Sequence, residues 1–261
     1  MTSTPFKDHF SSGSAGYAAY RPGYPLELID ELTSISPGTG RALDCGCGTG
    51  QLSVLLAERF DEVIATDASA AQIAAAEPRD GVVYRTARAE DSGLEANSVD
   101  LITVAQAAHW LDLDAFYAHA RRIARPQAAI ALITYGVLHL EGELDRHLHT
   151  FYYQTIAAYW PPERRHVETG YRDLPFPFTP IDVPPQVIEM RWTLDQLIGY
   201  LNTWSAVKAA EKALGVNPVD ELARALGEEW GDPATRRLVT WPLTIRCLLY
   251  TSPSPRDVEE S

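Results

Sequence analysis

The chain has 261 residues, of which 46% are hydrophobic, as in an ordinary folded α/β domain. Its net charge of −13 argues against nucleic acid as a partner, because nucleic-acid-binding proteins usually present a basic stripe to the phosphates. No apolar run approaches the roughly 20 residues that would span a bilayer, and the first ten residues carry no apolar signal core. Only three cysteines are present, too few for a disulfide framework, so we expect a cytoplasmic protein. We also expect no membrane contact and a monomer or homodimer.

Residues 1–36 are expected to form an N-terminal lid segment, whose proline- and glycine-containing run 17–25 is followed by a short helix over 26–32. Strands then alternate with helices through residues 37–136. The strands are expected at 42–44, 63–67, 82–84, 99–105 and 128–134, and the helices at 51–60, 70–76 and 114–124. This alternation predicts a Rossmann-like, doubly wound α/β fold with a mostly parallel sheet.

The alternation stops after residue 136. Residues 137–185 are rich in histidine, aromatic residues and proline, and we expect them to form an inserted helical cap. Residues 186–246 are expected to return to the core, with strands at 186–192 and 237–245 and helices at 194–214 and 219–230. The whole sheet would then have seven strands. The short basic clusters Arg121-Arg122 and Arg164-Arg165 are expected to be solvated helix faces or loop ends.

The last fifteen residues differ in character from the rest. Residues 247–257 read CLLYTSPSPRD, a string that resembles a translated sequencing adapter. The alternative is a natural, proline-rich disordered tail. We expect residues 247–261 to be artefactual and assign them no function.

The most specific motif is DCGCGTG at residues 44–50, between the first strand and its helix. Its glycines allow a tight turn and close approach to a ligand, and the helix that follows directs N–H groups and a positive dipole end to an anionic group. Asp44 at the strand end would repel a phosphate but attract an ammonium group. Asp67, which closes the second strand, can accept both hydroxyls of a ribose. An amino-acid head beside a ribose is what S-adenosylmethionine presents.

Two other nucleotide sites fit less well. A dinucleotide fingerprint needs its third glycine one residue later than Gly50, and the Gly-Lys-Ser/Thr of a P-loop is absent. Cys45 and Cys47 lack the further ligands of a zinc site, so we expect small buried fillers of the turn and no metal.

Residues 44–50 followed by Asp67 resemble the cofactor signature of class I S-adenosylmethionine-dependent methyltransferases of the methyltransferase type 11 kind. Three further motifs resemble the subgroup that includes trans-aconitate methyltransferase-like proteins: YRPGYP at 20–25, QAAHW at 106–110 and GYLNTWSA at 199–206. The chain departs from that pattern at 125–128, where RPQA replaces a Pro-Gly-Gly turn.

The resemblance implies which residues hold S-adenosylmethionine. The glycine loop would hold the methionine end of the cofactor and Asp67 its ribose. Ala68 would lie against the adenine, and Glu90 would lie near the adenine amino group. Asp67 as a helix N-cap and Glu90 as a solvated side chain remain alternatives. The cofactor-binding residues expected in this way are Asp44, Cys45, Gly46, Gly48, Gly50, Asp67, Ala68, Ala89, Glu90 and Gln106.

The acceptor side is less defined. His109 could orient or deprotonate an acceptor hydroxyl, or be a structural residue beside Trp110. Arg21 is the candidate for pairing with an acceptor carboxylate. The acceptor-binding residues expected are Tyr20, Arg21, Trp110, Tyr200 and Trp204, each with packing on the core as its alternative.

Together these features predict a methyltransferase that acts on a small-molecule acceptor, with a carboxylate as one candidate. An ionised carboxylate needs no general base, whereas a hydroxyl or amine acceptor would give His109 that role. A non-catalytic cofactor-binding or interaction protein on the same fold remains the alternative, because it would keep the same glycine loop.

Overall fold

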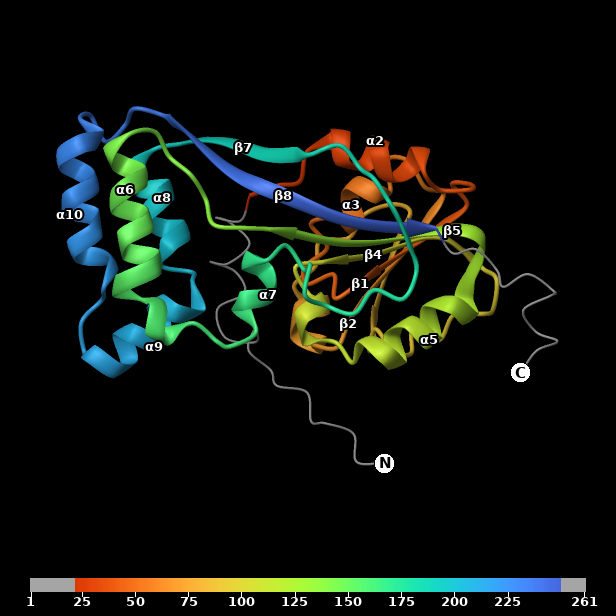
Figure 1. Ribbon diagram of the computed structural model, residues 1–261. Coiled ribbons are helices and arrows are strands. Elements are labelled where there is room, and N and C mark those ends of the chain that lie inside the picture. Colours follow the sequence, from red (N-terminus) through yellow and green to blue (C-terminus); the bar gives the residue numbers. More distant parts are fainter. Residues whose placement is uncertain (1–21, 250–261) are drawn as a thin grey trace.

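The computed structural model describes residues 22–249. Its centre is an eight-stranded sheet of order β3-β2-β1-β4-β5-β8-β6, in which β7 also pairs with β8 (Figure 1). The five parallel strands are β1 (Arg41–Cys45), β2 (Glu62–Asp67), β3 (Val82–Thr86), β4 (Val99–Ala105) and β5 (Ala124–Tyr135). β8 (Arg237–Leu249) pairs antiparallel with β5, and both β6 (Thr179–Ile181) and β7 (Gln186–Trp192) pair antiparallel with β8. The predicted Rossmann-like, mostly parallel sheet is therefore confirmed.

The sheet has one strand more than the seven expected. The additional strand is β6, which begins at the end of the proline-rich run at 175–180 and pairs with the end of β8. Proline favours extended backbone, so this run can lie along a sheet edge without being recognisable as a strand from its sequence.

Helices cover both faces of the sheet. Figure 1 shows α2 (Leu26–Ser34) and α3 (Ser53–Leu56) on one face and α5 (Leu113–Ile123) on the other. The apolar stripe of α5, at Phe116, Ala120 and Ile123, is buried, as the amphipathic spacing requires. Because both faces are covered, β4 is buried along nearly its whole length.

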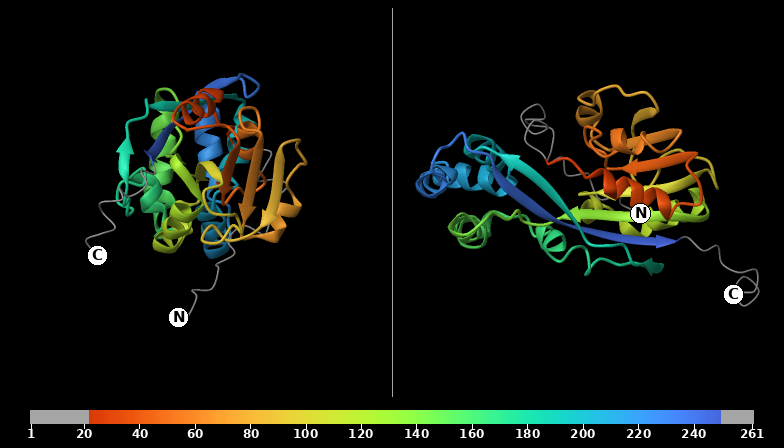
Figure 2. Two further views of the ribbon diagram at one scale, coloured as in Figure 1. Left: turned by 90° about the vertical axis from the view of Figure 1, so that its right-hand side faces the viewer. Right: turned by 90° about the horizontal axis from the view of Figure 1, so that it is seen from above.

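Four further helices pack together at one end of the sheet, in a group that we call the helical lobe. It consists of α6 (Glu143–Thr150), α8 (Leu194–Leu201), α9 (Ser205–Leu214) and α10 (Val219–Trp230). The long strands β7 and β8 connect it to the sheet (Figure 1, Figure 2). α6 continues into a π-helical turn (Phe151–Thr155), and the following 3-10 turn (Ala157–Tyr159) packs on α9. α7 (Arg164–Glu168) lies between the lobe and the sheet (Figure 1).

Two predicted helices differ in length from the observed ones. The helix expected at 51–60 is regular only over α3, because hydrogen bonds on either side of it mix three- and four-residue spacing. The helix expected at 194–214 is divided into α8 and α9. The Asn202 amide and the Thr203 hydroxyl donate to the carbonyls of Ile198 and Tyr200, and these bonds end α8.

The last strand is four residues longer than expected. The backbone of β8 continues to Leu249, which pairs with Ala129 of β5 and Thr179 of β6, and Cys247 is buried in the core. Residues 250–261 lie outside the described residues, as do Tyr20 and Arg21 of the expected acceptor site. None of the helices in residues 22–249 is both long and apolar enough to cross a membrane.

Trp241 of β8 connects the sheet to the helical lobe, and we expect it to be important for stability. Its side chain is fully buried and its indole N–H donates to the Tyr200 hydroxyl at 3.2 Å. Trp241→Ala should lower the free energy of unfolding by about 3–5 kcal/mol, measured by urea denaturation, because it leaves a large cavity. Val216→Ala, at a side chain 65% exposed, should change it by no more than about 0.5 kcal/mol. A loss below about 1 kcal/mol for Trp241→Ala would contradict this role.

Candidate active site

The loops that follow β1, β2, β3 and β4 meet at one edge of the sheet. The register places Cys45 of β1 beside Thr66 of β2 and Val104 of β4, and Asp67 of β2 beside Thr86 of β3. Ligands of open α/β sheets bind at this carboxyl edge. The predicted cofactor residues after these four strands therefore lie along the same edge.

The glycine loop after β1 requires its glycines for two reasons. Gly46 and Gly50 have φ angles of +67° and +88°, a region that other residues rarely adopt. A Cβ on Gly46 would also lie 2.6 Å from the Cβ of Ala107, and one on Gly50 would collide with the Tyr84 hydroxyl. The loop thus packs closely on β3 and on the segment after β4.

Asp44 lies beneath the glycine loop, with only 1% of its surface exposed. Its carboxylate accepts hydrogen bonds from the Ser53 hydroxyl at 2.6 Å and the Thr103 hydroxyl at 2.9 Å. Burial raises the pKa of Asp44 from its ordinary value of 3.8 to about 6, so the group is mainly ionised at neutral pH. Among the described residues, no cation forms an ion pair with it.

Tyr84 on β3 was missed in the sequence. Its hydroxyl is buried against Gly50 and has no hydrogen-bond partner among the described residues. Burial raises the pKa of Tyr84, and the nearby charge of Asp44 contributes to the shift. The only sequence signal was its place on a strand beside the glycine loop, which does not distinguish it from a packing residue.

Asp67 closes β2 and holds the glycine loop in place. Its two carboxylate oxygens accept the N–H groups of Gly48 at 2.9 Å and Ser69 at 2.8 Å. The N-cap of α4 (Ala70–Ala74) is Ser69, so the alternative role of Asp67 as that N-cap is wrong. Ala68 lies half-buried between these two residues.

The residues expected near the adenine are tied into the surrounding loops. Ala89 is buried. The Glu90 carboxylate accepts the N–H of Asp112 at 3.1 Å and pairs with Arg88 at 3.2 Å. Glu90 therefore links the loop after β3 to the start of α5, and is not the solvated side chain of the alternative.

Gln106, directly after β4, has a φ of +56°, which is costly for a residue other than glycine. Its side-chain amide donates to the carbonyl of Tyr135 at 3.1 Å and its oxygen accepts from the Thr134 hydroxyl at 3.2 Å. These bonds to the end of β5 hold the backbone that leads to His109 in one position.

His109 lies in a 3-10 turn (Ala108–Trp110) and stacks on Trp110 at 4.7 Å between ring centroids. Its Nδ1 is 2.9 Å from the hydroxyl of Tyr171, a buried residue with a φ of +61°. Burial, followed by the positive charge of Arg164, lowers the pKa of His109 to about 3. The imidazole is thus neutral and only weakly basic at physiological pH.

Tyr200 and Trp204 belong to an aromatic cluster between the lobe and the sheet. Tyr200 is buried and its ring packs against Trp204 at 5.7 Å and Trp241 at 5.6 Å. Trp204 is only partly buried. The members of the aromatic cluster are Tyr152, Trp160, Trp192, Tyr200, Trp204 and Trp241.

Arg164 of α7 is enclosed by this cluster, contrary to the expectation of a solvated face. Its guanidinium carbon lies 4.9 Å from the ring centre of Trp160 and 5.7 Å from that of Tyr152. Its Nε donates to the Tyr152 hydroxyl at 2.7 Å, which leaves its two terminal nitrogens with no partner among the described residues. No described carboxylate lies within ion-pair distance. The neighbouring Arg165 is exposed, as expected.

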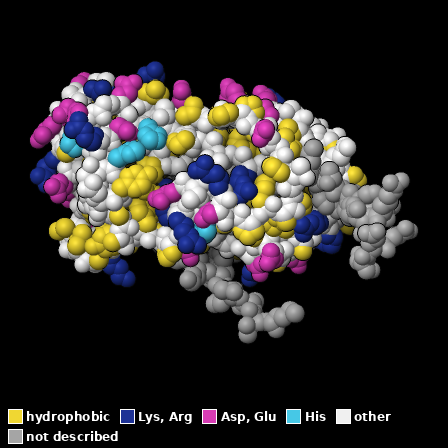
Figure 3. Space-filling view, in the orientation of Figure 1, with side chains coloured by type: hydrophobic (Ala, Val, Ile, Leu, Met, Phe, Trp, Pro, Cys, Tyr) yellow, Lys and Arg dark blue, Asp and Glu magenta, His cyan; other side chains and the backbone are white. Residues whose placement is uncertain are grey.

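The surface over α7 supports this distinction. In Figure 3, Lys and Arg side chains gather near the middle of the face, but Asp and Glu side chains are interspersed among them. The exposed charges on this face are thus mixed in sign. Arg164 differs from them, because it is held among aromatic rings and is linked to the carboxylate of Glu168 through the Tyr152 hydroxyl and not by a direct ion pair.

The buried Asp44 makes stability depend on pH. Because its folded pKa lies above the unfolded value, folding favours its protonated form, and its ionisation lowers stability as pH rises from about 4 to above 6. Asp44→Asn removes this effect. The free energy of unfolding of Asp44→Asn, relative to that of the unchanged protein, should increase by about 2 kcal/mol between pH 4 and pH 7, measured by urea denaturation. A difference that does not change with pH would contradict the assignment.

The comparisons with known proteins agree with this site. Residues 43–132 match the family of methyltransferase domains. The chain is 35% identical over 229 residues to a protein of Dictyostelium discoideum named as a methyltransferase, a match that covers 86% of this chain and 87% of that protein. It is 34% identical over 131 residues to a protein of Saccharomyces cerevisiae named as an S-adenosylmethionine-dependent methyltransferase, which covers 47% of this chain and 45% of that protein.

A solved structure shows the same architecture over nearly the whole chain. It is named as a type II methyltransferase from Anaeromyxobacter dehalogenans, with 48% identity and a TM-score of 0.86, and the match covers 89% of this chain and 99% of that one. With the glycine loop, Asp44 and Asp67 arranged along the carboxyl edge of the sheet, the chain belongs to the class I S-adenosylmethionine-dependent methyltransferases.

Proposed function

We propose that this enzyme transfers the methyl group of S-adenosylmethionine to a carboxylate oxygen of a small organic acid. The observation that carries the proposal is Arg164, a cation among aromatic rings that makes no direct ion pair with a described carboxylate and reaches Glu168 through the Tyr152 hydroxyl. An arginine fork is well suited to a carboxylate, and its bond strengthens where water is excluded. The carboxylate of an acid acceptor would form a direct ion pair with Arg164.

Arg164 is also close enough to the carboxyl edge of the sheet to serve an acceptor there. Its helix α7 contacts the turn that carries His109, and its charge contributes to the low pKa of His109. An acid held by Arg164 would thus lie near the end of β4, at the carboxyl edge where ligands of open α/β sheets bind. Arg21, the cation first expected in this role, lies outside the described residues.

The state of His109 supports the same class of acceptor. A general base works best with a pKa near the operating pH, whereas that of His109 is about 3. His109 would therefore be a poor general base for removing a proton from a hydroxyl or amine acceptor. A carboxylate is already ionised and needs only to be oriented, which neutral His109, fixed by Tyr171, is able to do.

The residues of the glycine loop fit the proposed cofactor. S-adenosylmethionine supplies a methyl group on a positively charged sulfur and, at its other end, an ammonium group. The ionised Asp44 has no cationic partner among the described residues, and its charge would favour that ammonium through space even though its carboxylate is occupied by two hydroxyls. The unpartnered Tyr84 hydroxyl offers a further hydrogen bond at the same loop. Asp67 keeps lone pairs for the ribose while holding Gly48 and Ser69.

A non-catalytic protein would keep this loop but would have no need of a largely enclosed arginine without a direct ion pair near its ligand. Leaving a charge without a partner in a partly dry site costs stability, and such a cost is usually offset by function. Arg164 therefore favours the enzyme over the binding protein.

Asp67 provides the test of the cofactor site. In Asp67→Asn, the new side-chain NH2 group would face the backbone N–H of Gly48 or Ser69, so the glycine loop is held less well. The substitution also removes acceptor capacity for the ribose hydroxyls, which weakens ribose binding. It should raise the Kd for S-adenosylhomocysteine at least tenfold, measured by calorimetry, while far-ultraviolet circular dichroism stays unchanged. Asp61→Asn is the control, because Asp61 is exposed at the opposite end of β2. An unchanged Kd for Asp67→Asn would exclude it from the cofactor site.

Arg164 provides the test of the acceptor. With trans-aconitate and other small carboxylic acids as acceptors, Arg164→Gln should raise KM at least tenfold and leave the Kd for S-adenosylhomocysteine within twofold, because only the acceptor uses this cation. Arg165→Gln is the matched control: it removes the same charge from the exposed neighbouring residue and should leave KM unchanged. Equal effects of the two substitutions would contradict an acceptor role for Arg164.

A further inference from the structure

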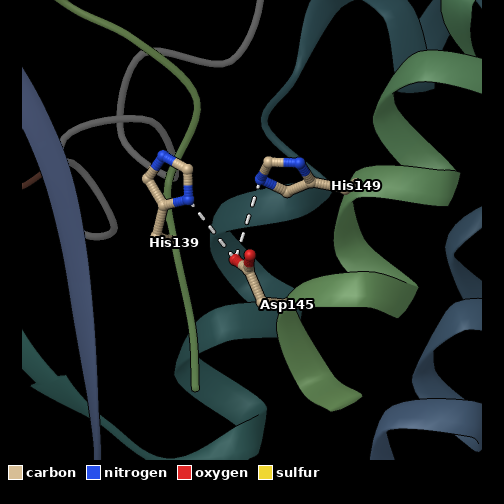
Figure 4. Close-up of side chains that lie close together, drawn as sticks. All are labelled: His139, Asp145 and His149. Carbon is tan, nitrogen blue, oxygen red and sulfur yellow. Dashed lines mark ion pairs between the residues drawn. The ribbon is translucent and has the colours of Figure 1, made fainter. Parts of the chain in front are cut away.

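Two histidines and an aspartate gather on the surface away from the glycine loop (Figure 4). We call them the His–Asp cluster: His139, Asp145 and His149. His139 lies on the linker after β5, whereas Asp145 and His149 lie one turn apart on α6. Figure 3 shows histidine side chains together on the surface between α6 and this linker. The cluster therefore joins two segments that belong to different parts of the fold.

The three side chains direct ligand atoms at one point. The Nδ1 of His139 is 3.5 Å and the Nε2 of His149 is 3.7 Å from the same carboxylate oxygen of Asp145, and all three lie within 4.8 Å of one another. In a tetrahedral zinc site with bonds of about 2.0 Å, neighbouring ligand atoms are about 3.3 Å apart. Small side-chain movements would bring this cluster to that geometry.

Two further contacts suit a metal site. The N–H of Leu140 donates to the Asp145 carboxylate at 2.8 Å and fixes its direction, as outer hydrogen bonds commonly do for ligand carboxylates. The Nε2 of His149 is buried and has no hydrogen-bond partner among the described residues, although it faces Asp145. A buried nitrogen without a partner is costly, and a bound cation would satisfy it.

We propose that His139, Asp145 and His149 bind a zinc ion, with water as the fourth ligand. Nitrogen ligands favour zinc over magnesium or calcium, which prefer oxygen. His139 is fixed to β8 by two backbone hydrogen bonds with Thr240, at 2.7 Å and 3.0 Å. The ion thus connects the sheet side of the molecule to α6 of the helical lobe. The role is structural, because the site is formed at the surface and none of its residues belongs to the glycine loop.

The position of His149 adds a consequence for the aromatic cluster. Its ring packs on Tyr153 at 5.6 Å, and Tyr153 packs on Tyr152 at 4.7 Å. Tyr152 is the residue whose hydroxyl accepts from Arg164. A zinc ion on His149 therefore steadies the segment that holds Arg164.

Calorimetry tests the site with untagged protein that has been treated with a chelator and dialysed. Addition of zinc chloride should give one binding event per chain and raise the midpoint of thermal unfolding, whereas magnesium chloride should do neither. His149→Ala and Asp145→Asn should weaken zinc binding at least thirtyfold and abolish the shift of the midpoint.

His147→Ala is the matched control, because His147 lies on the same helix outside the cluster, and it should bind zinc like the unchanged protein. The proposal is overturned if zinc does not bind, or if His149→Ala binds zinc as tightly as His147→Ala. It is also overturned if His149→Ala lowers the midpoint equally with and without zinc, which would show that the cluster acts only through ion pairs.

Discussion

The buried carboxylate of Asp44 connects the elements on which the active site depends. It ends β1, accepts from Ser53 at the start of α3 and accepts from Thr103 of β4. The glycine loop spans the short distance between β1 and α3, so these two hydrogen bonds fix both of its ends. Keeping an ionised group in this position costs stability, since burial is the main cause that raises the pKa of Asp44 to about 6 even with these two hydrogen bonds present. A bound cation would reduce that cost.

The site is therefore divided by charge. Carboxylates lie under and beside the glycine loop, where the cofactor would carry its positive groups, whereas Arg164 lies on α7, which contacts the turn that carries His109. A carboxylate acceptor would bind to Arg164, and the methyl donor would be bound at the glycine loop. In-line transfer between such partners needs alignment and exclusion of water more than it needs acid–base chemistry, and the neutral His109 agrees with that. The aromatic cluster excludes water around Arg164 without neutralising its charge.

The core of the fold was predictable because local patterns determine it. Buried strands alternated with helices at regular spacing, and the glycine loop marked the first crossover. The strand at 63–67 and the helix at 219–230 were predicted closely, since apolar spacing alone defines such segments. The break between α8 and α9 and the strand β6 were missed, because side-chain caps and pairing with a distant strand decide them.

The candidate site was predictable only where sequence neighbours form it. Asp44 and Asp67 follow their strands directly and lie where expected. Arg164 was not recognised, because its environment comes from Tyr152, Trp160 and Trp204, which only tertiary structure brings around it. Tyr171 and the His–Asp cluster were missed for the same reason. The expected cap at 137–185 gave a compositional signal of histidine, aromatic residues and proline, but composition does not show which of these side chains contact one another.

The central claim is that the enzyme methylates a small carboxylate. Transfer of a labelled methyl group from S-adenosylmethionine can be measured for matched acceptor sets, in which each small acid is compared with its amide and with a phenol and an amine of similar size. The account predicts a base-labile methyl ester on the acid and no transfer to its amide. Preferential methylation of the phenol or the amine would contradict it.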